Sequence, residues 1–327
     1  MLDCFGVEYK FLSKEDTLFG IVSCSWLRKL CTQFTWQWHI GGKGFKYFLR
    51  VKKYVSEESI RLSTGLSTVY RKWIPQGESR AIIVGVHGFA EHTGRYHNLG
   101  NFLAQNGYAL YMYDLRGHGK SQGEKGYIDK FENFVEDTVA FFESVKTFFP
   151  NKKVFLLGHS MGGLIAVHTA SVLGDKINGL ITSGAAVQLE ASTRDRIMVS
   201  LMSKIAPKSR VKLPVKVECL STDPEVGKRY TEDPLVLKEV TMKLLFEFSR
   251  GVLGARDAIQ KIRVPALVMH GSRDCLVPVE ASKMLFEGLG VQDKTLKIYD
   301  GMLHEIFNEV EKEKVFRDLA DWLNKHV

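Results

Sequence analysis

The chain has 327 residues, of which 45% are hydrophobic and 25% charged, as in an ordinary globular protein large enough for one α/β domain with an insertion. No apolar run is long enough to cross a bilayer, and the first residues lack the basic start and apolar middle of a secretory signal. The formal net charge is +8, but residues 1–53 hold nine Lys or Arg against four Asp or Glu, which leaves only +3 for the rest. Because that remainder is nearly neutral, no nucleic-acid partner is expected.

The five cysteines are an odd number and show no C-x-x-C spacing. Neither a disulfide framework nor a zinc site is therefore indicated, and we expect reduced thiols in a cytoplasmic protein. The cysteines are Cys4, Cys24, Cys31, Cys219 and Cys275.

Residues 1–53 differ from the rest of the chain. They carry three of the five tryptophans, Trp26, Trp36 and Trp38, with weak periodicity. A basic, aromatic-rich segment could lie in a membrane interface. That role requires strong amphipathicity, which is not visible here, so we favour a poorly ordered extension or a translation start placed too early.

From residue 54 to residue 184, predicted strands alternate with predicted helices. The first two strands form an antiparallel hairpin, and residues 81–86 are an unbroken apolar run, typical of a strand buried on both faces. The alternation predicts an α/β fold, with a mostly parallel central sheet and helices on both faces. The predicted strands are 54–62, 68–74, 81–86, 108–113, 154–158 and 179–183, and the predicted helices are 95–106, 131–148 and 164–170.

The alternation stops between residues 185 and 254. This segment has helical apolar patterns near 197–205 and 240–252 with prolines between them, so we predict a helical cap inserted into the fold. Residues 255–327 return to the core. They contain predicted strands at 266–270 and 295–299 and predicted helices at 279–287 and 311–324. The predicted divisions are therefore 1–53, 54–184, 185–254 and 255–327.

A nucleophile elbow is predicted where the strand at 154–158 meets the next helix. Residues 158–162 read GHSMG, a match to G-x-S-x-G in a strand–turn–helix context. Such a turn is too tight for a Cβ at either glycine, and it exposes the Oγ of Ser160. The N–H of Met161 lies at the helix N-terminus, where free N–H groups favour an anion.

A serine nucleophile needs a base and an acid that orients the base, in the chain order Ser, Asp or Glu, His for this kind of fold. The loops after the last two predicted strands supply Asp274 and His304. Because the carboxyl ends of parallel strands meet at one edge of a sheet, Ser160, Asp274 and His304 are predicted to converge. Asp300 and Glu305 are rival acids, but Glu305 is adjacent to His304 and points away from it.

An oxyanion hole needs a second N–H besides that of Met161. Phe89 follows the first buried parallel strand, and we expect its N–H to be this donor. His87 is expected to be structural, and His270 to lie within the sheet. No metal or cofactor is predicted, because the histidines before the elbow match no metal-site spacing. These histidines include His87, His92, His97 and His118.

Six motifs together point to one family. They are residues 87–96 (HGFAEHTGRY), 114–121 (DLRGHGKS), 158–163 (GHSMGG), 220–226 (LSTDPEV), 271–278 (GSRDCLVP) and 304–309 (HEIFNE). From about residue 54 onward the chain resembles the monoacylglycerol lipase and lysophospholipase group of the α/β-hydrolase superfamily. The resemblance implies an α/β-hydrolase fold, a triad of Ser160, Asp274 and His304, and the N–H groups of Phe89 and Met161 as oxyanion donors. Residues 1–53 lie outside the resemblance.

By this resemblance the chain is a serine esterase that cleaves monoacylglycerols to fatty acid and glycerol through an acyl-enzyme. The alternatives are a lysophospholipase or broad carboxylesterase, and an acyltransferase with the same triad. The intact Ser, Asp and His argue against a silent binding module. Apolar cap residues would line an acyl tunnel or else pack on the main domain. These residues are Ile197, Met198, Leu201, Met202 and Ile205.

The expected partner is a lipid ester substrate, with peripheral membrane contact through the cap or the N-terminal segment. Exposed apolar residues around the cap could serve membrane docking or a dimer contact, and the oligomeric state stays open. Cys219 and Cys275 could approach the site, although the role of small buried filler is favoured for both.

Overall fold

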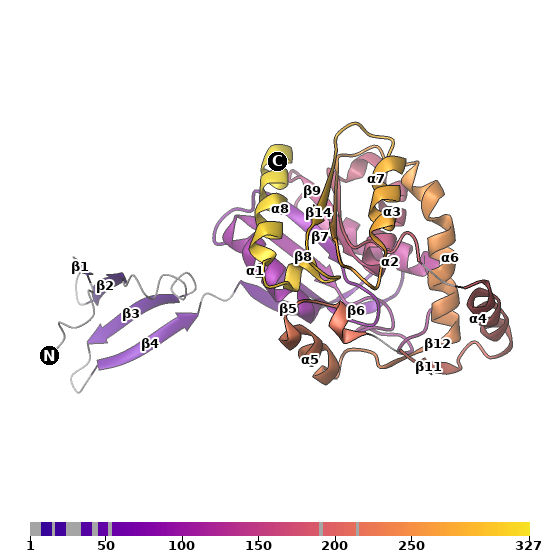
Figure 1. Ribbon diagram of the computed structural model, residues 1–327. Coiled ribbons are helices and arrows are strands. Elements are labelled where there is room, and N and C mark those ends of the chain that lie inside the picture. The colour runs from indigo at the N-terminus through magenta and orange to yellow at the C-terminus, as the bar shows by residue number, and fades with distance from the viewer. Residues whose placement is uncertain are drawn as a thin grey trace. The chain divides into compact units, whose positions relative to one another are not determined.

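The computed structural model describes residues 8–14, 17–23, 34–40, 45–51, 54–189, 192–213 and 216–327. The chain divides into two compact units, Met1–Lys53 and Tyr54–Val327 (Figure 1). All residues of the predicted site belong to the second unit.

The N-terminal unit contains two antiparallel hairpins. Strand β1 (Glu8–Lys14) pairs with β2 (Thr17–Ser23), and β3 (Phe34–Ile40) pairs with β4 (Phe45–Val51). Sequence analysis assigned no strand here and favoured a poorly ordered extension. The strands agree with the sequence of β3, which alternates apolar and polar residues with the period of two that a strand requires. The membrane-interface hypothesis for residues 1–53 concerns side chains that lie outside the described residues.

The second unit is built on one eight-stranded sheet. β5 and β6 form the predicted antiparallel hairpin, β6 also pairs antiparallel with β8, and the other neighbours in the sheet are parallel. The predicted mostly parallel α/β sheet is therefore confirmed. In spatial order the strands are β14 (Lys294–Tyr299), β13 (Ala266–Gly271), β10 (Gly179–Ser183), β9 (Val154–His159), β7 (Ala81–Val86), β8 (Tyr108–Tyr113), β6 (Ser67–Trp73) and β5 (Val55–Arg61).

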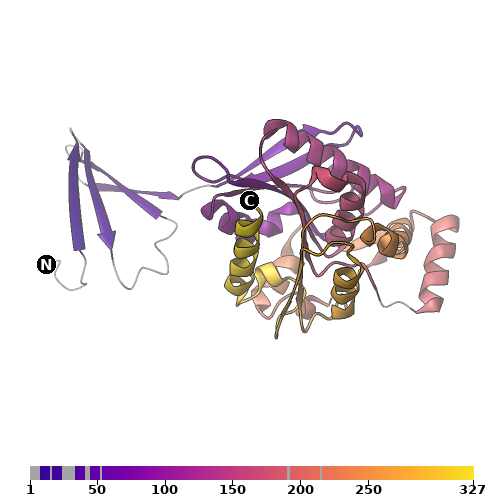
Figure 2. The same ribbon diagram turned by 90° about the horizontal axis from the view of Figure 1, so that it is seen from above.

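Helices cover both faces of this sheet (Figure 2). Alternate residues of β7 enter different cores, because Ile82 and Val84 pack with α2, α3, α6 and α7, whereas Ile83 packs with α1 and α8. Every residue of β7, β8 and β9 is buried, which explains their continuous apolar sequences. The helices around the sheet are α1 (His97–Gln105), α2 (Phe131–Phe148), α3 (Met161–Leu173), α6 (Met242–Ile259), α7 (Val279–Gly288) and α8 (Lys312–His326), with short 3-10 turns η3 (Thr93–Tyr96), η4 (Gly174–Lys176) and η6 (Ile306–Asn308).

Additional elements lie between β10 and α6, in the segment predicted to form a cap. They are α4 (Thr193–Ile205), β11 (Arg210–Lys212), η5 (Val217–Cys219), α5 (Pro224–Glu232) and β12 (Glu239–Thr241). β11 and β12 pair as a small antiparallel sheet. None of the helices in the described segments is long and apolar enough to span a membrane.

Sequence analysis missed α5 and the β11–β12 pair. α5 begins with Asp223, whose Oδ1 accepts the N–H of Glu225 at 3.0 Å, and with a proline at the first helical position. This is a known helix start, but no helix was predicted from it. Helix α6 also runs past the predicted boundary at residue 254, because Ala255 and Ala258 in its last turns belong to the main core.

Candidate active site

Ser160 stands at the turn between β9 and α3 in a backbone conformation that side chains rarely adopt. Its φ is +55°, which requires support from the surrounding structure. The Ser160 N–H donates to the carbonyl oxygen of Ser183 at 2.9 Å, and the Ser160 carbonyl accepts the N–H of Ala186 at 3.1 Å. This strand–turn–helix geometry is that of the predicted elbow.

Two glycines allow the helix to return against the sheet. A Cβ on Gly158 would lie 2.2 Å from the carbonyl oxygen of Gly162, and a Cβ on Gly162 would lie 2.3 Å from the carbonyl oxygens of Val86 and His87. The start of α3 therefore touches the end of β7. This contact brings Ser160 beside the loop that follows β7.

Asp274 and His304 lie in the loops after β13 and β14, and they are hydrogen-bonded to each other. The Nδ1 of His304 is 2.6 Å from the Oδ2 of Asp274. The other carboxylate oxygen accepts the N–H groups of Leu276 at 2.8 Å and Val277 at 3.0 Å. Because Nδ1 is occupied in this way, the Nε2 of His304 is the nitrogen left for proton transfer.

The surroundings shift the pKa values of Asp274 and His304 in opposite directions. Burial would raise the pKa of Asp274, but hydrogen bonds from His270 and His304 hold it far below its usual range. Burial would lower the pKa of His304, but the hydrogen bond and charge of Asp274 outweigh it and raise that pKa above its ordinary value. The ring of His159 lies 4.7 Å from that of His304, and burial, with repulsion from His304, lowers the pKa of His159 to about 3. His159 is therefore a neutral neighbour of the base.

A second histidine contacts the same carboxylate, and sequence analysis did not predict this contact. The Nε2 of His270, in β13, lies 3.1 Å from the Oδ2 of Asp274 and 3.1 Å from the carbonyl oxygen of Val277. Both neighbours are acceptors, so Nε2 carries the hydrogen, and Nδ1 accepts from the hydroxyl of Ser282 at 2.7 Å. The position of His270 within the sheet was predicted. Asp274 follows His270 by four residues, and this spacing was the feature of the sequence that could have indicated the contact.

The two rival acids have other partners. Both carboxylate oxygens of Glu305 accept from Nη2 of Arg95, at 2.5 and 2.7 Å. Asp300 accepts the hydroxyl of Ser272 at 3.2 Å. The carboxylate that orients the ring of His304 is thus that of Asp274.

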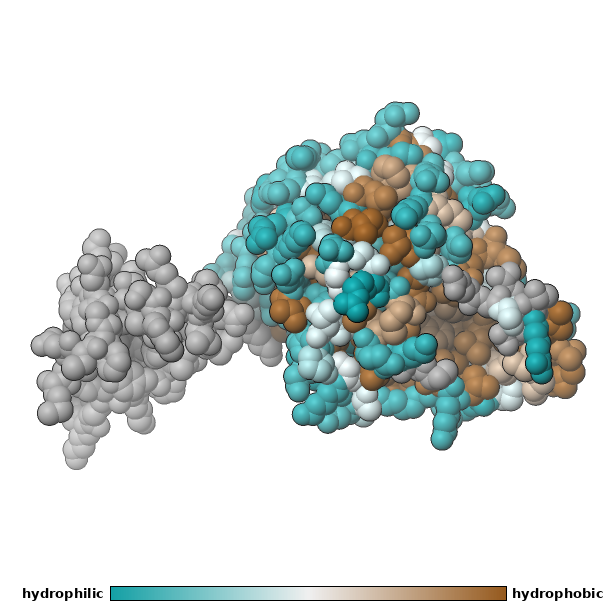
Figure 3. Space-filling view, viewed as in Figure 1, coloured by the Kyte–Doolittle hydropathy of each residue, from teal (hydrophilic) through white to brown (hydrophobic). Residues whose placement is uncertain are grey.

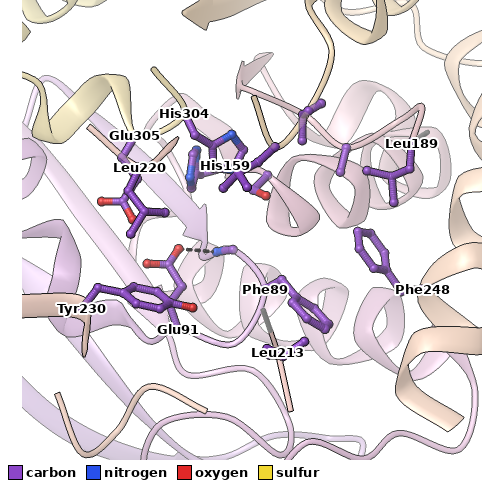
Figure 4. Close-up of a pocket in the computed structure, with 15 residues that line it drawn as sticks. Phe89, Glu91, His159, Leu189, Leu213, Leu220, Tyr230, Phe248, His304 and Glu305 are labelled. Atoms are coloured by element: carbon purple, nitrogen blue, oxygen red, sulfur yellow. Dashed lines mark hydrogen bonds between the residues drawn. The ribbon is translucent and has the colours of Figure 1, made fainter. Parts of the chain in front are cut away.

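Ser160 and His304 line one cavity of about 220 Å³ (Figure 4). Among the described residues that line it, the Ser160 hydroxyl and the His304 imidazole share the cavity without a direct hydrogen bond. Such catalytic contacts often tighten only when substrate binds. Phe89, Leu189, Leu213 and Phe248 line one end of the cavity, and Glu91, Tyr230 and Glu305 line the other.

The predicted oxyanion donors lie in the loop after β7, which carries Phe89, and at the start of α3, which carries Met161. In the part of the chain that the structure describes, neither the N–H of Phe89 nor that of Met161 donates to a protein acceptor. Glu91 holds the loop in shape, because its Oε1 accepts the N–H of Gly88 at 2.6 Å and the hydroxyl of Tyr96 at 2.7 Å. Sequence analysis included Glu91 only as part of a motif, and its role as an anchor depends on this folded loop.

Arg95 pairs with both carboxylates at the polar end of the cavity. Its Nε donates to Glu91 at 3.0 Å, its Nη2 donates to Glu305, and its guanidinium lies 4.8 Å from the centre of the Tyr230 ring. One cation thus serves two carboxylates. Gly88 and Tyr96 donate to Oε1 of Glu91, and Asn308 donates to Oε2 of Glu305 at 2.8 Å. Oε2 of Glu91 and Oε1 of Glu305 then have one donor each and can accept a hydroxyl hydrogen from a ligand.

None of the described side chains of helix α4 lines the cavity, so the predicted acyl tunnel is wrong for the five apolar residues assigned to it. The alternative, packing of its apolar stripe on the main domain, is also wrong for four of the five residues. α4 packs on α6, and the cavity wall comes instead from the segments on either side of α4 and from α6. The exposed apolar residues of α4 are Ile197 (64%), Met198 (52%), Leu201 (55%) and Ile205 (70%), whereas Met202 is partly buried.

Cys219 and Cys275 are joined by a disulfide, with their Cα atoms 5.6 Å apart. The expectation of reduced thiols is wrong for this pair, and so is the role of simple buried filler. The two residues are 56 positions apart, and only the folded cap brings η5 against the loop after β13, so spacing could not reveal the pairing. The predicted cytoplasmic location thereby loses its cysteine argument and stays a prediction.

The histidines before the elbow have structural contacts. His87 accepts the N–H of Leu115 at 2.9 Å, and His92 lies 2.9 Å from Asp233 in the cap segment. Burial lowers the pKa of His118 to about 3. Among residues that the structure describes, no group of three or more His, Cys, Asp or Glu could hold a metal ion.

The sheet order, the elbow and the acid and base loops define an α/β-hydrolase. The family described as serine aminopeptidase, S33, matches residues 77–311. The chain is 32% identical to a monoacylglycerol lipase of Mycolicibacterium smegmatis, over 83% of this chain and 98% of that protein. It is 31% identical to a monoglyceride lipase of Homo sapiens, over 78% and 86% of the two chains.

A solved structure supports the same family. The crystal structure of Paleococcus ferrophilus monoacylglycerol lipase matches with a TM-score of 0.72 at 32% identity, and covers 80% of this chain and 99% of that chain. The chain therefore belongs to the serine aminopeptidase S33 family of α/β-hydrolases, within its monoacylglycerol lipase group. The resemblance identified from its motifs is confirmed.

Gly162→Ala should destabilise the fold, although alanine is the better helix former. The new Cβ would meet two backbone carbonyl oxygens at 2.3 Å. Backbone atoms cannot rotate aside, so we expect the free energy of unfolding, measured by chemical denaturation, to fall by about 1–3 kcal/mol. The control is Gly254→Ala in α6, where the Cβ would meet only the ring of His168 at 3.2 Å. Equal stability of the two variants would contradict the steric argument.

Proposed function

We propose that this enzyme hydrolyses monoacylglycerols to a fatty acid and glycerol, with Ser160, Asp274 and His304 as its catalytic triad. The observation that carries the proposal is the two-ended cavity that the nucleophile lines, with apolar side chains at one end and polar side chains at the other. An ester with an apolar acyl chain and a small alcohol rich in hydroxyls fits this division. The lipases to which the chain is similar support the same substrate.

The geometry supports an acyl-enzyme mechanism. The Nε2 of His304 takes the proton of the Ser160 hydroxyl while Oγ attacks the ester carbonyl carbon, and Asp274 stabilises the imidazolium through Nδ1. The imidazolium then protonates the alcohol oxygen, and glycerol leaves. Water, deprotonated by His304, attacks the acyl carbonyl carbon. Ser160 then regains its proton, and the fatty acid is released.

The N–H groups of Phe89 and Met161 are the proposed donors to the tetrahedral oxyanion. Both are free of protein acceptors within the described chain. One stands at the N-terminus of α3, where the helix dipole adds to the effect. Preorganised donors of this kind typically contribute about 10²–10³-fold each to turnover.

The polar end favours glycerol over a phospholipid headgroup. Glu91 and Glu305 can accept hydroxyl hydrogens, whereas the phosphate of a lysophospholipid would lie against two carboxylates. Arg95, the cation between them, already pairs with both. Like-charge repulsion therefore opposes the phosphate, and the lysophospholipase alternative is disfavoured.

Ser160→Ala should abolish ester hydrolysis, because the acyl-enzyme cannot form. We expect a loss of about 10³-fold or more in kcat, measured on monoacylglycerols of several chain lengths, a diacylglycerol, a lysophosphatidylcholine and a short aryl ester. Ser171→Ala, in the same helix, is the control and should keep full activity. Faster turnover of the lysophosphatidylcholine would show that the substrate is wrong while the triad stands. Transfer of the acyl group to an added alcohol would favour the acyltransferase alternative. Wild-type rates for Ser160→Ala would exclude this nucleophile.

The pH profile should report the raised pKa of His304. The neutral imidazole is the active base, so kcat/KM should fall as the pH drops through this pKa, with a midpoint above the ordinary value of 6.5. Asp274→Asn removes the charge that raises the pKa, so the midpoint should move to lower pH while kcat falls by about 10⁴-fold. An activated aryl ester makes the residual rate measurable. Asp300→Asn is the control and should leave the midpoint unchanged. A wild-type midpoint below 6.5 would argue against this electrostatic assignment.

We propose further that α4 contacts an anionic lipid surface. Four of its apolar residues are exposed, and so is Leu253 of α6, the helix on which α4 packs, at 74%. Figure 3 shows apolar side chains gathered at the end of the molecule where α4 lies in Figure 1. Lys204, Lys208 and Lys212 near this helix are also exposed, and cations next to apolar side chains suit anionic headgroups. α6, on which α4 packs, also carries Phe248 at the apolar end of the cavity.

The double variant Leu201→Glu, Ile205→Glu should bind vesicles that contain phosphatidylserine at least about tenfold more weakly, because each such side chain contributes about 1.5–3 kcal/mol when buried. Vesicle cosedimentation measures the binding, and kcat on a water-soluble ester should not change. Phe148→Glu, at the exposed end of α2, is the control and should bind like the wild type. Undiminished binding by the double variant would refute the lipid contact. A wild-type dimer that the double variant loses in ultracentrifugation would assign α4 to a dimer interface instead.

A further inference from the structure

A short segment of the cap lies between the loops that carry Asp274 and His304. On the side of the base, the carbonyl oxygen of Cys219 accepts the N–H of His304 at 3.1 Å, and that of Leu220 accepts the N–H of Glu305 at 2.7 Å. The backbone of the base loop is thus held directly by the cap.

A buried carboxylate reinforces this attachment. Glu309 accepts the N–H of Thr222 at 3.0 Å through Oε2 and the N–H of Leu303 at 2.7 Å through Oε1. It is only 1% exposed, so these bonds are shielded from water and strong. The base loop therefore has several non-covalent attachments to residues 219–222.

The acid loop is attached to the same segment in another way. Cys275 directly follows Asp274, and its disulfide to Cys219 is a covalent link between acid loop and cap. Apolar side-chain packing supports this link, because Leu276 packs against a small buried cluster that includes Leu220. The segment at Cys219 thus connects both loops, by hydrogen bonds to one and by a disulfide to the other.

We propose that the Cys219–Cys275 disulfide positions Asp274 against His304, so that its reduction lowers turnover and its re-formation restores it. Without the link, the base loop stays on the cap. The acid loop keeps its bonds to the base loop just before Asp274, where the N–H of Arg273 donates to the carbonyl oxygen of Met302 at 2.9 Å. The part of the acid loop from Asp274 onward loses its covalent link to the cap, and the hydrogen bond between acid and base loosens. The inference rests on the proposed roles of Asp274 and His304.

A reductant can reach the disulfide because one of its two cysteines is exposed. Cys275 is exposed, whereas Cys219 is buried. A thiolate of a small dithiol reductant attacks the sulfur of Cys275, the S–S bond breaks, and Cys219 leaves as a thiolate that takes up a proton. The second thiol of the reductant then displaces Cys275. Two electrons and two protons pass to the enzyme, and the reductant becomes a cyclic disulfide.

The experiment compares oxidised, reduced and reoxidised enzyme. Dithiothreitol is the reductant, thiol alkylation with mass spectrometry reports the state of each cysteine, and circular dichroism confirms that the fold is intact at the assay temperature. We expect reduction to lower kcat on a short aryl ester by about three- to tenfold with little change in KM, because misplaced catalytic groups affect the chemical step. Removal of the reductant and reoxidation should restore the rate.

Two variants complete the design. Cys4→Ser, Cys24→Ser, Cys31→Ser removes the other three cysteines, and it should respond to reductant like the wild type. Cys219→Ser, Cys275→Ser should have the low kcat of the reduced enzyme and should not respond to reductant. Should this variant fail to fold, the reversible change in the wild type still tests the inference.

Two results would overturn the inference. One is a wild type in which Cys219 and Cys275 remain free thiols after air oxidation. The other is a fully reduced enzyme that keeps the kcat of the oxidised form. Neither bears on the triad, because Ser160→Ala tests the nucleophile in the same assay. If Ser160→Ala is active while reduction still lowers kcat, the proposed function fails and the redox response stands.

Discussion

The contact between α3 and the end of β7 is the constraint on which the active site depends. Gly162 brings the helix against the carbonyl oxygens of Val86 and His87, at a distance that no Cβ would fit. This single approach places the strained Ser160 next to the loop that carries Phe89. A hydrogen bond from the N–H of Ser160 to β10 and one from Ala186 to its carbonyl offset the strain. Nucleophile and proposed oxyanion donors are thus positioned by backbone packing before any substrate arrives.

The negative charge of Asp274 depends on a balance between burial and hydrogen bonding. A carboxylate as buried as that of Asp274 would become neutral unless hydrogen-bond donors surround it. Four N–H groups do so, from the rings of His304 and His270 and from the backbone of Leu276 and Val277. They keep the carboxylate charged, and its charge in turn raises the pKa of His304. The raised pKa of His304 therefore depends in part on His270 and on the backbone N–H groups of Leu276 and Val277, which support the charge of Asp274.

The features that sequence analysis found are those encoded by local patterns. β7 and β8 are unbroken apolar runs because both of their faces are buried, and α2 repeats apolar residues with a helical period. GHSMG specifies its turn through two glycines within five residues. The missed features are contacts between distant segments. His270 reaches Asp274 only through the path of a loop, and Cys219 meets Cys275 only after the cap has folded. The exposure of α4 also depends on which side of that helix packs on α6, which periodicity alone does not reveal.

The cap therefore helps to position the loop of His304 as well as forming part of the cavity wall. It supplies Leu213 and Tyr230 to opposite ends of the cavity, and its backbone at Cys219 and Leu220 holds the loop of His304. A disulfide that closes a loop of this length stabilises a fold by about 3–5 kcal/mol in the chain-entropy account. The chain between the two cysteines contains α5, β12, α6 and β13, so the disulfide restricts all of these elements in the unfolded chain. By the proposed role of the disulfide, changes in the cap near Cys219 act also on the contact between Asp274 and His304.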